Sequence, residues 1–387
     1  MNFSFQSKIK IPQLLGYLDF IPSQFLLLIL GIFLATGMGC KPKTKENKPT
    51  ANFDRQLMLS QLADGYILPY SNSFSIASDS LNWAAQNYAS NTSSSNLALL
   101  QNQWVKTYDA FLYVYSLNFG PGEKPIVGTL AENVGIWPVN KNRIEEKVAM
   151  SLTDFSQDFE RDTRGLLTLD YLLFDSISIT KFTIGADTLK RRTYLLALTN
   201  HVKTWANDLS SGWIGYRDAF VNNNGKDAGS SISMFYNTFL LGYEVLKNYK
   251  IALPAGKRVG QTQIEPSLVE AYYSQQSLHF LQTHLTAITH LWFNISYQGA
   301  NQSGFDDWLS SLSDGPPLKT QTETQFIALS QKVQDLQIGL PLSDRLQQDP
   351  ACLDNLYATC QQTTRLVKSD LSSLIGIAIT YTSGDGD

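Results

Sequence analysis

Cysteine and histidine, side chains suited to transition metals, are scarce in this chain, which has 3 cysteines and 4 histidines in 387 residues. The HExxH spacing of zinc enzymes and the Gly-x-Ser-x-Gly elbow of serine hydrolases are both absent. Basic residues number 30 and acidic residues 34, with no basic stripe. These absences argue against zinc hydrolases, serine hydrolases and a nucleic-acid partner.

Three of the histidines, His279, His284 and His290, fall on one predicted helix. His279 and His290 share a face of that helix but lie ~16 Å apart along its axis. His284 is rotated about 140° from His279. A bis-histidine site on this helix is therefore excluded, and we interpret these residues and His201 as surface or hydrogen-bonded histidines.

The N-terminus has the features of an export signal. Residues 25–35 (FLLLILGIFLA) form an apolar run behind two lysines, too short to span a bilayer, which needs ~20 residues. Small residues then lead into Cys40, as in a bacterial lipobox. We predict a signal peptide over residues 1–39 and a lipidated Cys40 with a flexible tether over residues 40–52. The alternative is an ordinary signal peptide that is cleaved near Cys40.

Apolar residues that recur every three or four positions dominate the rest of the chain, and this spacing predicts helices. The clearest stripe is Leu97, Leu100, Trp104, Tyr108, Phe111 and Tyr115, and a second is Leu278, Leu281, Leu285, Ile288 and Trp292. Only residues 375–381 (IGIAITY) have a β-like pattern. We predict an all-α chain of two helical-bundle domains, residues 53–215 and 216–387, with breaks at residues 210–212 and 222–229.

One predicted helical segment carries the most specific signal. Residues 164–174 read Arg-Gly-Leu-Leu-Thr-Leu-Asp-Tyr-Leu-Leu-Phe. They resemble the signature segment of the imelysin family, where Gly-x-His-x-x-Glu precedes a Tyr-Leu-Leu-Phe-like run. On that pattern Gly165 is retained, Leu167 stands at the histidine position and Asp170 at the glutamate position. Residues three apart on a helix can share one cation, but leucine has no lone pair with which to bind it.

Other segments resemble landmarks of the same family in the same order. They are residues 111–121, 137–140, 250–254, 269–278 and the C-terminal residues 375–387. The resemblance implies two four-helix-bundle-like domains with the signature segment near a cleft between them. It also implies export to the bacterial cell envelope and an association with iron uptake. Some relatives have been described as peptidases.

The acids Asp170 and Glu270 are the candidates for a site, since each lies in a family-like segment. Two carboxylates in a cleft could bind iron or another divalent or trivalent metal through oxygen. Trp137 and Arg164 are expected to shape that cleft. The alternative is that Asp170 pairs with a nearby cation such as Arg164, and that Glu270 caps or salt-bridges a helix start.

The other two cysteines, Cys352 and Cys360, are eight residues apart. A disulfide would need a turn between them, which Pro350 permits, because on an uninterrupted helix they would be ~12 Å apart. An oxidising envelope compartment would favour such a structural bridge.

These observations favour a non-catalytic, imelysin-like envelope lipoprotein that binds a ligand or metal in the cleft and is linked to iron uptake. It would be held at the membrane through its lipid anchor, on the periplasmic side or at the outer membrane, with other envelope proteins as partners. One rival is a metallopeptidase of the same family, against which Leu167 argues because an activated water needs about three protein ligands on its metal. Another is a cell-surface protein-interaction module.

Overall fold

The computed structural model describes residues 53–155 and 159–381. The predicted signal peptide, Cys40, the tether and the Asp385–Asp387 tail lie outside the described residues. Residues Thr50–Asp387 form one compact unit. The prediction of an all-α chain is confirmed, because within the described ranges the β-structure is a single two-stranded sheet and an isolated bridge between Ile295 and Asn301.

The first half of the chain contains the helices α2 to α9 and the sheet. The α-helices are α2 (Arg55–Leu62), α3 (Leu68–Ser90), α4 (Ser94–Val114), α5 (Leu130–Val134), α6 (Lys141–Ala149), α7 (Leu166–Phe174), α8 (Ser176–Thr180) and α9 (Thr188–Asn222). A π-helical turn, η1 (Ala63–Ile67), joins α2 to α3, and 3₁₀ turns lie at η2 (Gly120–Gly122) and η3 (Arg161–Thr163). Strands β1 (Glu123–Lys124) and β2 (Gly128–Thr129) pair antiparallel.

The second half is also helical. Its α-helices are α10 (Ser231–Val245), α11 (Ser277–Phe293), α12 (Phe305–Ser311), α13 (Gly315–Leu336), α14 (Leu342–Gln348), α15 (Asp354–Thr364) and α16 (Leu371–Ile375). The π-helical turns η4 (Leu246–Ala252) and η6 (Arg365–Asp370) continue α10 and α15, and η5 (Pro266–Leu268) is a 3₁₀ turn. The β-like stretch at residues 375–381 forms no strand.

Local sequence explains where the main helices begin. Ser93 caps α4 by accepting the backbone N–H of Asn96, and Ser230 caps α10 through the N–H of Ser233. The apolar stripe predicted for α4 is buried except for the partly buried Leu97, and Trp104 and Phe111 are fully enclosed. Periodicity of this kind is what brings one face of a helix into a core.

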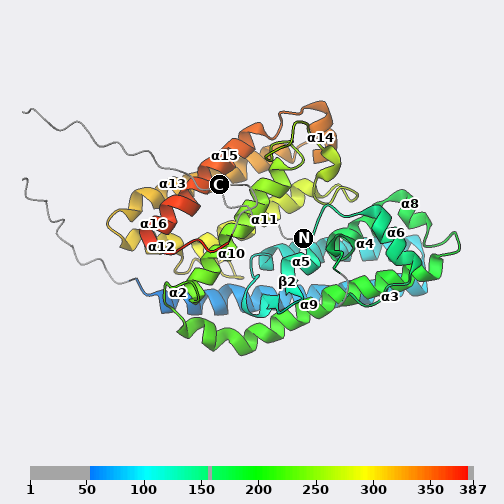
Figure 1. Ribbon diagram of the computed structural model, residues 1–387, viewed down its shortest axis with the longest axis horizontal. Coiled ribbons are helices and arrows are strands. Elements are labelled where there is room, and N and C mark those ends of the chain that lie inside the picture. Colours follow the sequence, from blue (N-terminus) through cyan, green and yellow to red (C-terminus); the bar gives the residue numbers. More distant parts are fainter. Residues whose placement is uncertain (1–52, 156–158, 382–387) are drawn as a thin grey trace, which may run out of the picture. The chain divides into compact units, whose positions relative to one another are not determined.

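The helices pack in two sets that share α11 as a neighbour. In the first set α3 packs along both α4 and α9, and in the second α13 packs against α11, α12 and α15. Helix α11 contacts α4 as well as α13, so it joins the two sets (Figure 1). The division into domains at residues 215 and 216 stays a prediction.

The break predicted at residues 210–212 is wrong, because α9 runs through it without interruption. Gly212 serves close packing there: a Cβ at this position would lie 2.7 Å from Cβ of Pro121. Gly212 is thus a packing residue inside α9, where the missing side chain lets the turn η2 lie against the helix.

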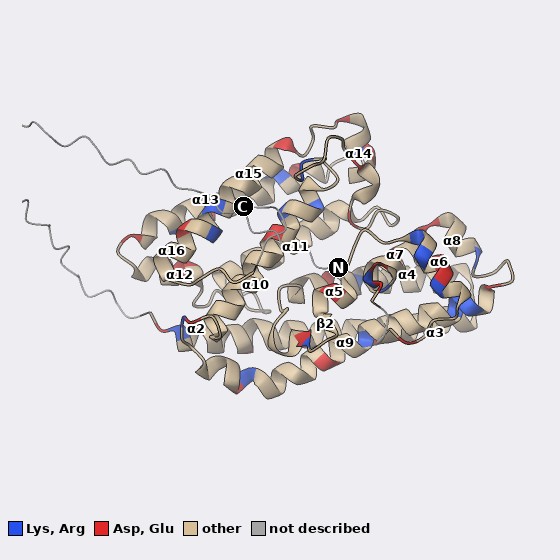
Figure 2. Cartoon of the chain, in the orientation of Figure 1, with Lys and Arg blue, Asp and Glu red and all other residues tan. Residues whose placement is uncertain are grey.

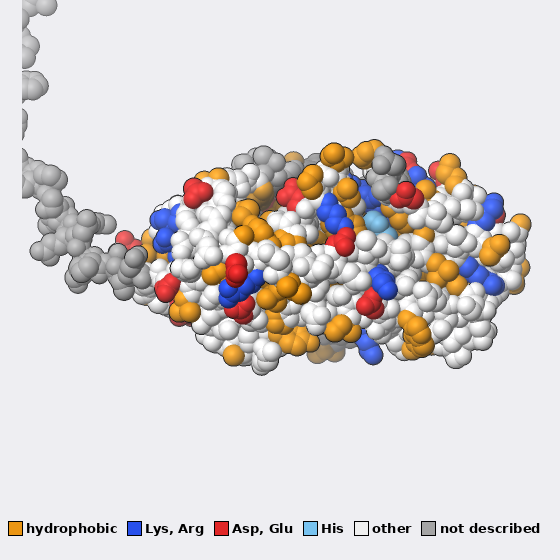
Figure 3. Space-filling model, turned by 90° about the horizontal axis from the view of Figure 1, so that it is seen from below, with side chains coloured by type: hydrophobic (Ala, Val, Ile, Leu, Met, Phe, Trp, Pro, Cys, Tyr) orange, Lys and Arg blue, Asp and Glu red, His pale blue; other side chains and the backbone are white. Residues whose placement is uncertain are grey.

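Charges of both signs are interspersed over the helices (Figure 2). On the face seen from below, hydrophobic side chains form small groups that polar atoms separate (Figure 3). Within the described residues, no helix combines the length and the apolar character needed to cross a membrane.

Candidate functional site

The signature helix α7 begins at a glycine that no other residue could replace without strain. Gly165, the residue before the helix, has φ of +86°. A Cβ there would lie 2.4 Å from the carbonyl oxygen of Val134, far inside van der Waals contact. Gly165 therefore lets α7 start directly against the end of α5.

Asp170 is buried, with 2% of its surface exposed, and both carboxylate oxygens are in use. Its Oδ2 accepts the backbone N–H of Tyr273 at 3.0 Å and its Oδ1 that of Ser274 at 3.0 Å. The acid of the signature helix thus holds the connection before α11 in place through these two hydrogen bonds. The alternative pairing of Asp170 with Arg164 is not formed among the described residues, and Arg164 donates to the carbonyl of Phe155 at 2.8 Å.

Burial raises the pKa of Asp170 from 3.8 to about 7. The hydrogen bonds from Ser274 and Tyr273 favour the charged form and act against this rise, whereas the negative charge of Glu270 adds to it. The desolvation effect is the largest of these, so the acid takes up a proton near neutral pH.

A second buried acid lies close to Asp170 and is paired with a lysine. Glu270 Oε1 is 2.7 Å from Nζ of Lys250, and both side chains are almost fully buried. The hydroxyl of Tyr108 on α4 donates to the same oxygen at 2.5 Å. Burial lowers the pKa of Lys250, while Glu270 opposes this shift. The salt bridge considered for Glu270 is therefore present, with Lys250 of η4 as partner.

His284 is fully buried near this ion pair but makes no hydrogen bond to the described residues through either ring nitrogen. Burial and the nearby charge of Lys250 hold its pKa well below 6.5, so the ring is neutral. It packs against the ring of Tyr115 with centroids 4.9 Å apart. His201 lies elsewhere, bonded to the carbonyl of Asn133, and burial lowers its pKa to about 4.

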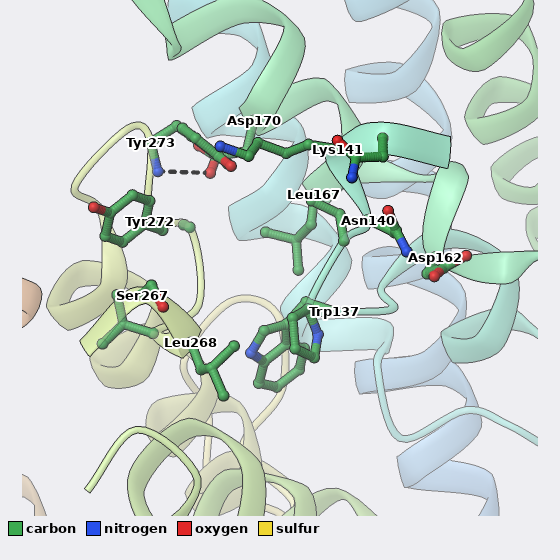
Figure 4. Close-up of a pocket in the computed structure, with 15 residues that line it drawn as sticks. Trp137, Asn140, Lys141, Asp162, Leu167, Asp170, Ser267, Leu268, Tyr272 and Tyr273 are labelled. Atoms are coloured by element: carbon green, nitrogen blue, oxygen red, sulfur yellow. Dashed lines mark hydrogen bonds between the residues drawn. The ribbon is translucent and has the colours of Figure 1, made fainter. Parts of the chain in front are cut away.

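A cavity of about 630 Å³ opens beside α7. In Figure 4, Tyr272 and Leu268 lie across from Leu167 and Asn140, with Trp137 at one end and Asp170 with Tyr273 at the other. Leu167 therefore contributes an apolar wall where the family signature has an imidazole. The cavity has the size of a site for a small organic ligand.

The cavity also carries polar groups without protein partners. Tyr272 and Ser267 make no hydrogen bond through their hydroxyls to the described residues, and Tyr272 is 38% exposed. Oδ1 of Asp162 is buried and has no partner there, whereas Oδ2 accepts from Arg143. These groups, together with the indole ring of Trp137, are available to a ligand.

Comparison with known proteins identifies the family of the chain. The family model described as Imelysin matches residues 67–368. The chain belongs to the imelysin family. No curated protein matches it.

Two solved structures share the fold of this imelysin-family chain. A protein described as an iron-regulated protein A precursor from Parabacteroides distasonis ATCC 8503 has a TM-score of 0.67 and 18% identity, over 83% of this chain and 95% of that one. An imelysin-like protein from Psychrobacter arcticum 273-4 has a TM-score of 0.65 and 17% identity, over 84% of this chain and 97% of that one. At these identities the likeness establishes the fold alone.

The residues at the signature position do not fit a metal ion. Leu167 offers no donor atom, and both oxygens of Asp170 already accept backbone N–H groups. Glu270 Oε1 is shared by Lys250 and Tyr108, and its Oε2, which has no hydrogen-bond partner among the described residues, lies outside the lining of the cavity. Among the residues that the structure describes, no three His, Cys, Asp or Glu side chains are grouped as metal ligands would be.

The structure brings some of the expected site residues together and separates others. Trp137, Leu167 and Asp170 line the cavity, while Glu270 lies buried outside the lining. Arg164 is buried and also lies outside the lining. Cys352 and Cys360 are free thiols, so the expected disulfide is not formed. Cys360 is inside α15, where it is buried and the helix keeps it apart from Cys352.

Sequence reasoning did not assign site roles to Lys250, Tyr108 and Tyr272. Lys250 and Tyr272 lie in segments that resemble family landmarks, and that signal could have brought them forward. Tyr108 belongs to the apolar stripe of α4, where its ring is expected in the core. Its hydroxyl bond to Glu270, 162 residues away, has no local signal in the sequence.

Proposed function

We propose that this imelysin-family chain is a non-catalytic binding protein of the bacterial cell envelope, anchored through Cys40 and serving iron acquisition. The cavity beside α7 is its ligand site. The observation that carries the proposal is the double backbone bond of Asp170, which gives the signature acid a structural role beside a leucine that cannot bind a metal.

The chemistry of the cavity supports an organic ligand over a bare metal ion. Its walls combine the rings of Trp137 and Tyr272 with the apolar side chains of Leu167 and Leu268. Free hydroxyl and carboxylate oxygens lie among these surfaces. Apolar walls with a few convergent polar groups are typical of small-molecule sites. If the ligand carries iron, the iron is held by the ligand's own donors.

The link to iron acquisition rests on the family and on the name of the relative from Parabacteroides distasonis, which is described as iron-regulated. Lipidation at Cys40, with attachment to a membrane facing the periplasm or to the outer membrane, rests on the N-terminal sequence. The rival metallopeptidase would require a metal held by about three protein ligands with an open position for water, whereas the signature residues offer a single carboxylate and no imidazole.

Mass spectrometry of the intact protein, purified from its own cells grown without added iron, tests the binding site. We expect a small molecule that stays bound under native conditions and is released on unfolding. Leu167→Trp, which fills the cavity from α7, should abolish binding of this small molecule. Leu99→Trp, on the exposed face of α4, should leave its binding unchanged. Retention in the Leu167 variant would contradict the proposed site, and chelator-sensitive peptide cleavage would favour the peptidase.

A further inference from the structure

A second cavity, of about 390 Å³, shares the residue Trp137 with the first. It has no counterpart among the features expected from the sequence. Its walls come from the connection after α4, from β2, α5 and the connection after α5, and from α10, η4 and the connection after η4. Its apolar part includes Ile136, Leu241 and Val245. Trp137 lines both cavities, but the signature residues Leu167 and Asp170 line only the first.

Aromatic rings bound much of this second cavity. Tyr115 and Tyr249 line it together with Trp137, whose ring meets that of Tyr249 edge-on with centroids 6.1 Å apart. Neither tyrosine hydroxyl has a hydrogen-bond partner within the described part of the chain. The cavity therefore offers flat apolar contact and two phenol groups that can donate to or accept from a ligand.

The charges in the wall leave one cation without a compensating acid. Glu132 is paired with Arg161 at 2.5 Å, and Glu244 with Lys368 at 2.7 Å. The guanidinium of Arg258 lies over the ring of Tyr249, 4.3 Å from its centroid. No carboxylate of residues 53–155 or 159–381 lies within 4.0 Å of it. Arg258 therefore gives the cavity a single uncompensated positive charge.

The loop that carries Arg258 is held in place. Gln261 accepts the backbone N–H of Arg258 at 3.1 Å and donates to the carbonyl of Leu253 at 3.1 Å. The neighbouring Lys257 is 2.8 Å from Asp354. Because stacking on Tyr249 also orders the guanidinium, little side-chain freedom remains to be lost when an anion binds.

We propose that this second cavity binds a small aromatic carboxylate. The carboxylate accepts hydrogen bonds from the guanidinium of Arg258, and the ring lies against Trp137, Tyr115 and the apolar side chains. A monoanion matches the single uncompensated charge, whereas a phosphate would bring more negative charge than one arginine balances. The aromatic walls select a flat body over a branched aliphatic one.

Isothermal titration calorimetry of the full chain with benzoate tests this proposal. We expect one saturable site, and binding weaker by about tenfold or more for benzamide, which lacks the charge, and for cyclohexanecarboxylate, which lacks the flat ring. Arg258→Gln should lower the affinity for benzoate by a similar factor, while Arg258→Lys should keep part of that affinity. Arg365→Gln changes an exposed arginine outside this lining, so it is the matched control and should bind benzoate as the parent does.

A variant in the first cavity separates this proposal from the proposed function. Tyr272→Ala should leave benzoate binding unchanged, because Tyr272 lines only the first cavity. Loss in Tyr272→Ala with retention in Arg258→Gln would place benzoate in the first cavity and overturn the proposal. Equal affinity for Arg258→Gln and the parent, or no saturable binding of benzoate, would overturn it as well. Thermal unfolding of each variant establishes that it is folded.

Discussion

Asp170 on α7 accepts the backbone N–H of Ser274 at 3.0 Å, across 104 residues of sequence. Together with the bond from Tyr273, this contact uses both oxygens of the signature acid to hold the connection before α11. In the family signature the acid and a histidine three residues earlier could share a cation. Here Leu167 stands at the histidine position, and the acid has a structural role because it binds the backbone of the connection before α11.

The raised pKa of Asp170 gives a pH dependence of definite sign. Its folded pKa of about 7 lies above its ordinary 3.8, so the folded state binds the proton more tightly than the unfolded state. Its contribution to the free energy of unfolding is therefore fully present below pH 4 and is lost as the pH rises through 7. The loss is on the order of 4 kcal/mol.

Urea unfolding of the parent and Asp170→Asn, from pH 4 to pH 8, measures this contribution. The free energy of unfolding of the parent minus that of the variant should decrease as the pH rises. Carboxylates whose pKa is lowered, such as Glu132 and Glu145, give the opposite trend but occur in both proteins and cancel. A difference that stays flat or increases with pH would show that the backbone bonds, and not burial, set the pKa of Asp170.

The buried pair of Lys250 and Glu270 should be strongly coupled. Lys250→Met leaves a buried carboxylate without its cation and should lower the free energy of unfolding by about 3–5 kcal/mol. Glu270→Gln alone should also destabilise the protein. The double variant should lose less free energy of unfolding than the sum of the two single variants. Chemical unfolding of the four proteins yields the coupling energy.

The exposed pair of Lys124 and Asp208 is the matched control for that cycle. These side chains are 30% and 50% exposed, so the same cycle should give at most about 1 kcal/mol. Additive losses at Lys250 and Glu270 would mean that the buried pair is not coupled in solution.

Gly165 should be intolerant of a side chain. In Gly165→Ala the new Cβ would clash with the carbonyl of Val134, and the residue would also have to adopt a left-handed φ. The free energy of unfolding should therefore fall by more than the roughly 1–3 kcal/mol expected from backbone strain alone. Gly185→Ala isolates the strain, because Gly185 has φ of +115° with no atom within 4 Å of its Cβ position. Thermal unfolding compares the two, and equal losses would rule out the steric contact at Gly165.

Periodicity in the sequence predicts the helices well because one apolar face of each enters a core. The stripe from Leu97 to Tyr115 becomes α4, and that from Leu278 to Trp292 becomes α11. The glycine at residue 212 led to a wrongly predicted break, because its role depends on a contact with Pro121 that the local sequence does not reveal. Long-range packing decides such positions.

The site was predictable in its residues more than in their roles. Leu167, Asp170 and Trp137 are named by the signature and its neighbouring landmarks, and they line one cavity. The use of both Asp170 oxygens by backbone N–H groups depends on a connection about a hundred residues away. The choice of Lys250 as partner of Glu270 likewise depends on how η4 packs, which sequence spacing does not encode.

The metal content of the purified chain tests the central claim most directly. The parent and Asp170→Ala are incubated with iron and then with zinc, desalted, and measured by inductively coupled plasma mass spectrometry against protein concentration. Because Leu167 cannot bind a metal and the described residues hold no group of three His, Cys, Asp or Glu side chains around Asp170, we predict well below one equivalent in both proteins. One equivalent of metal in the parent that is lost in Asp170→Ala would contradict this account of the signature site.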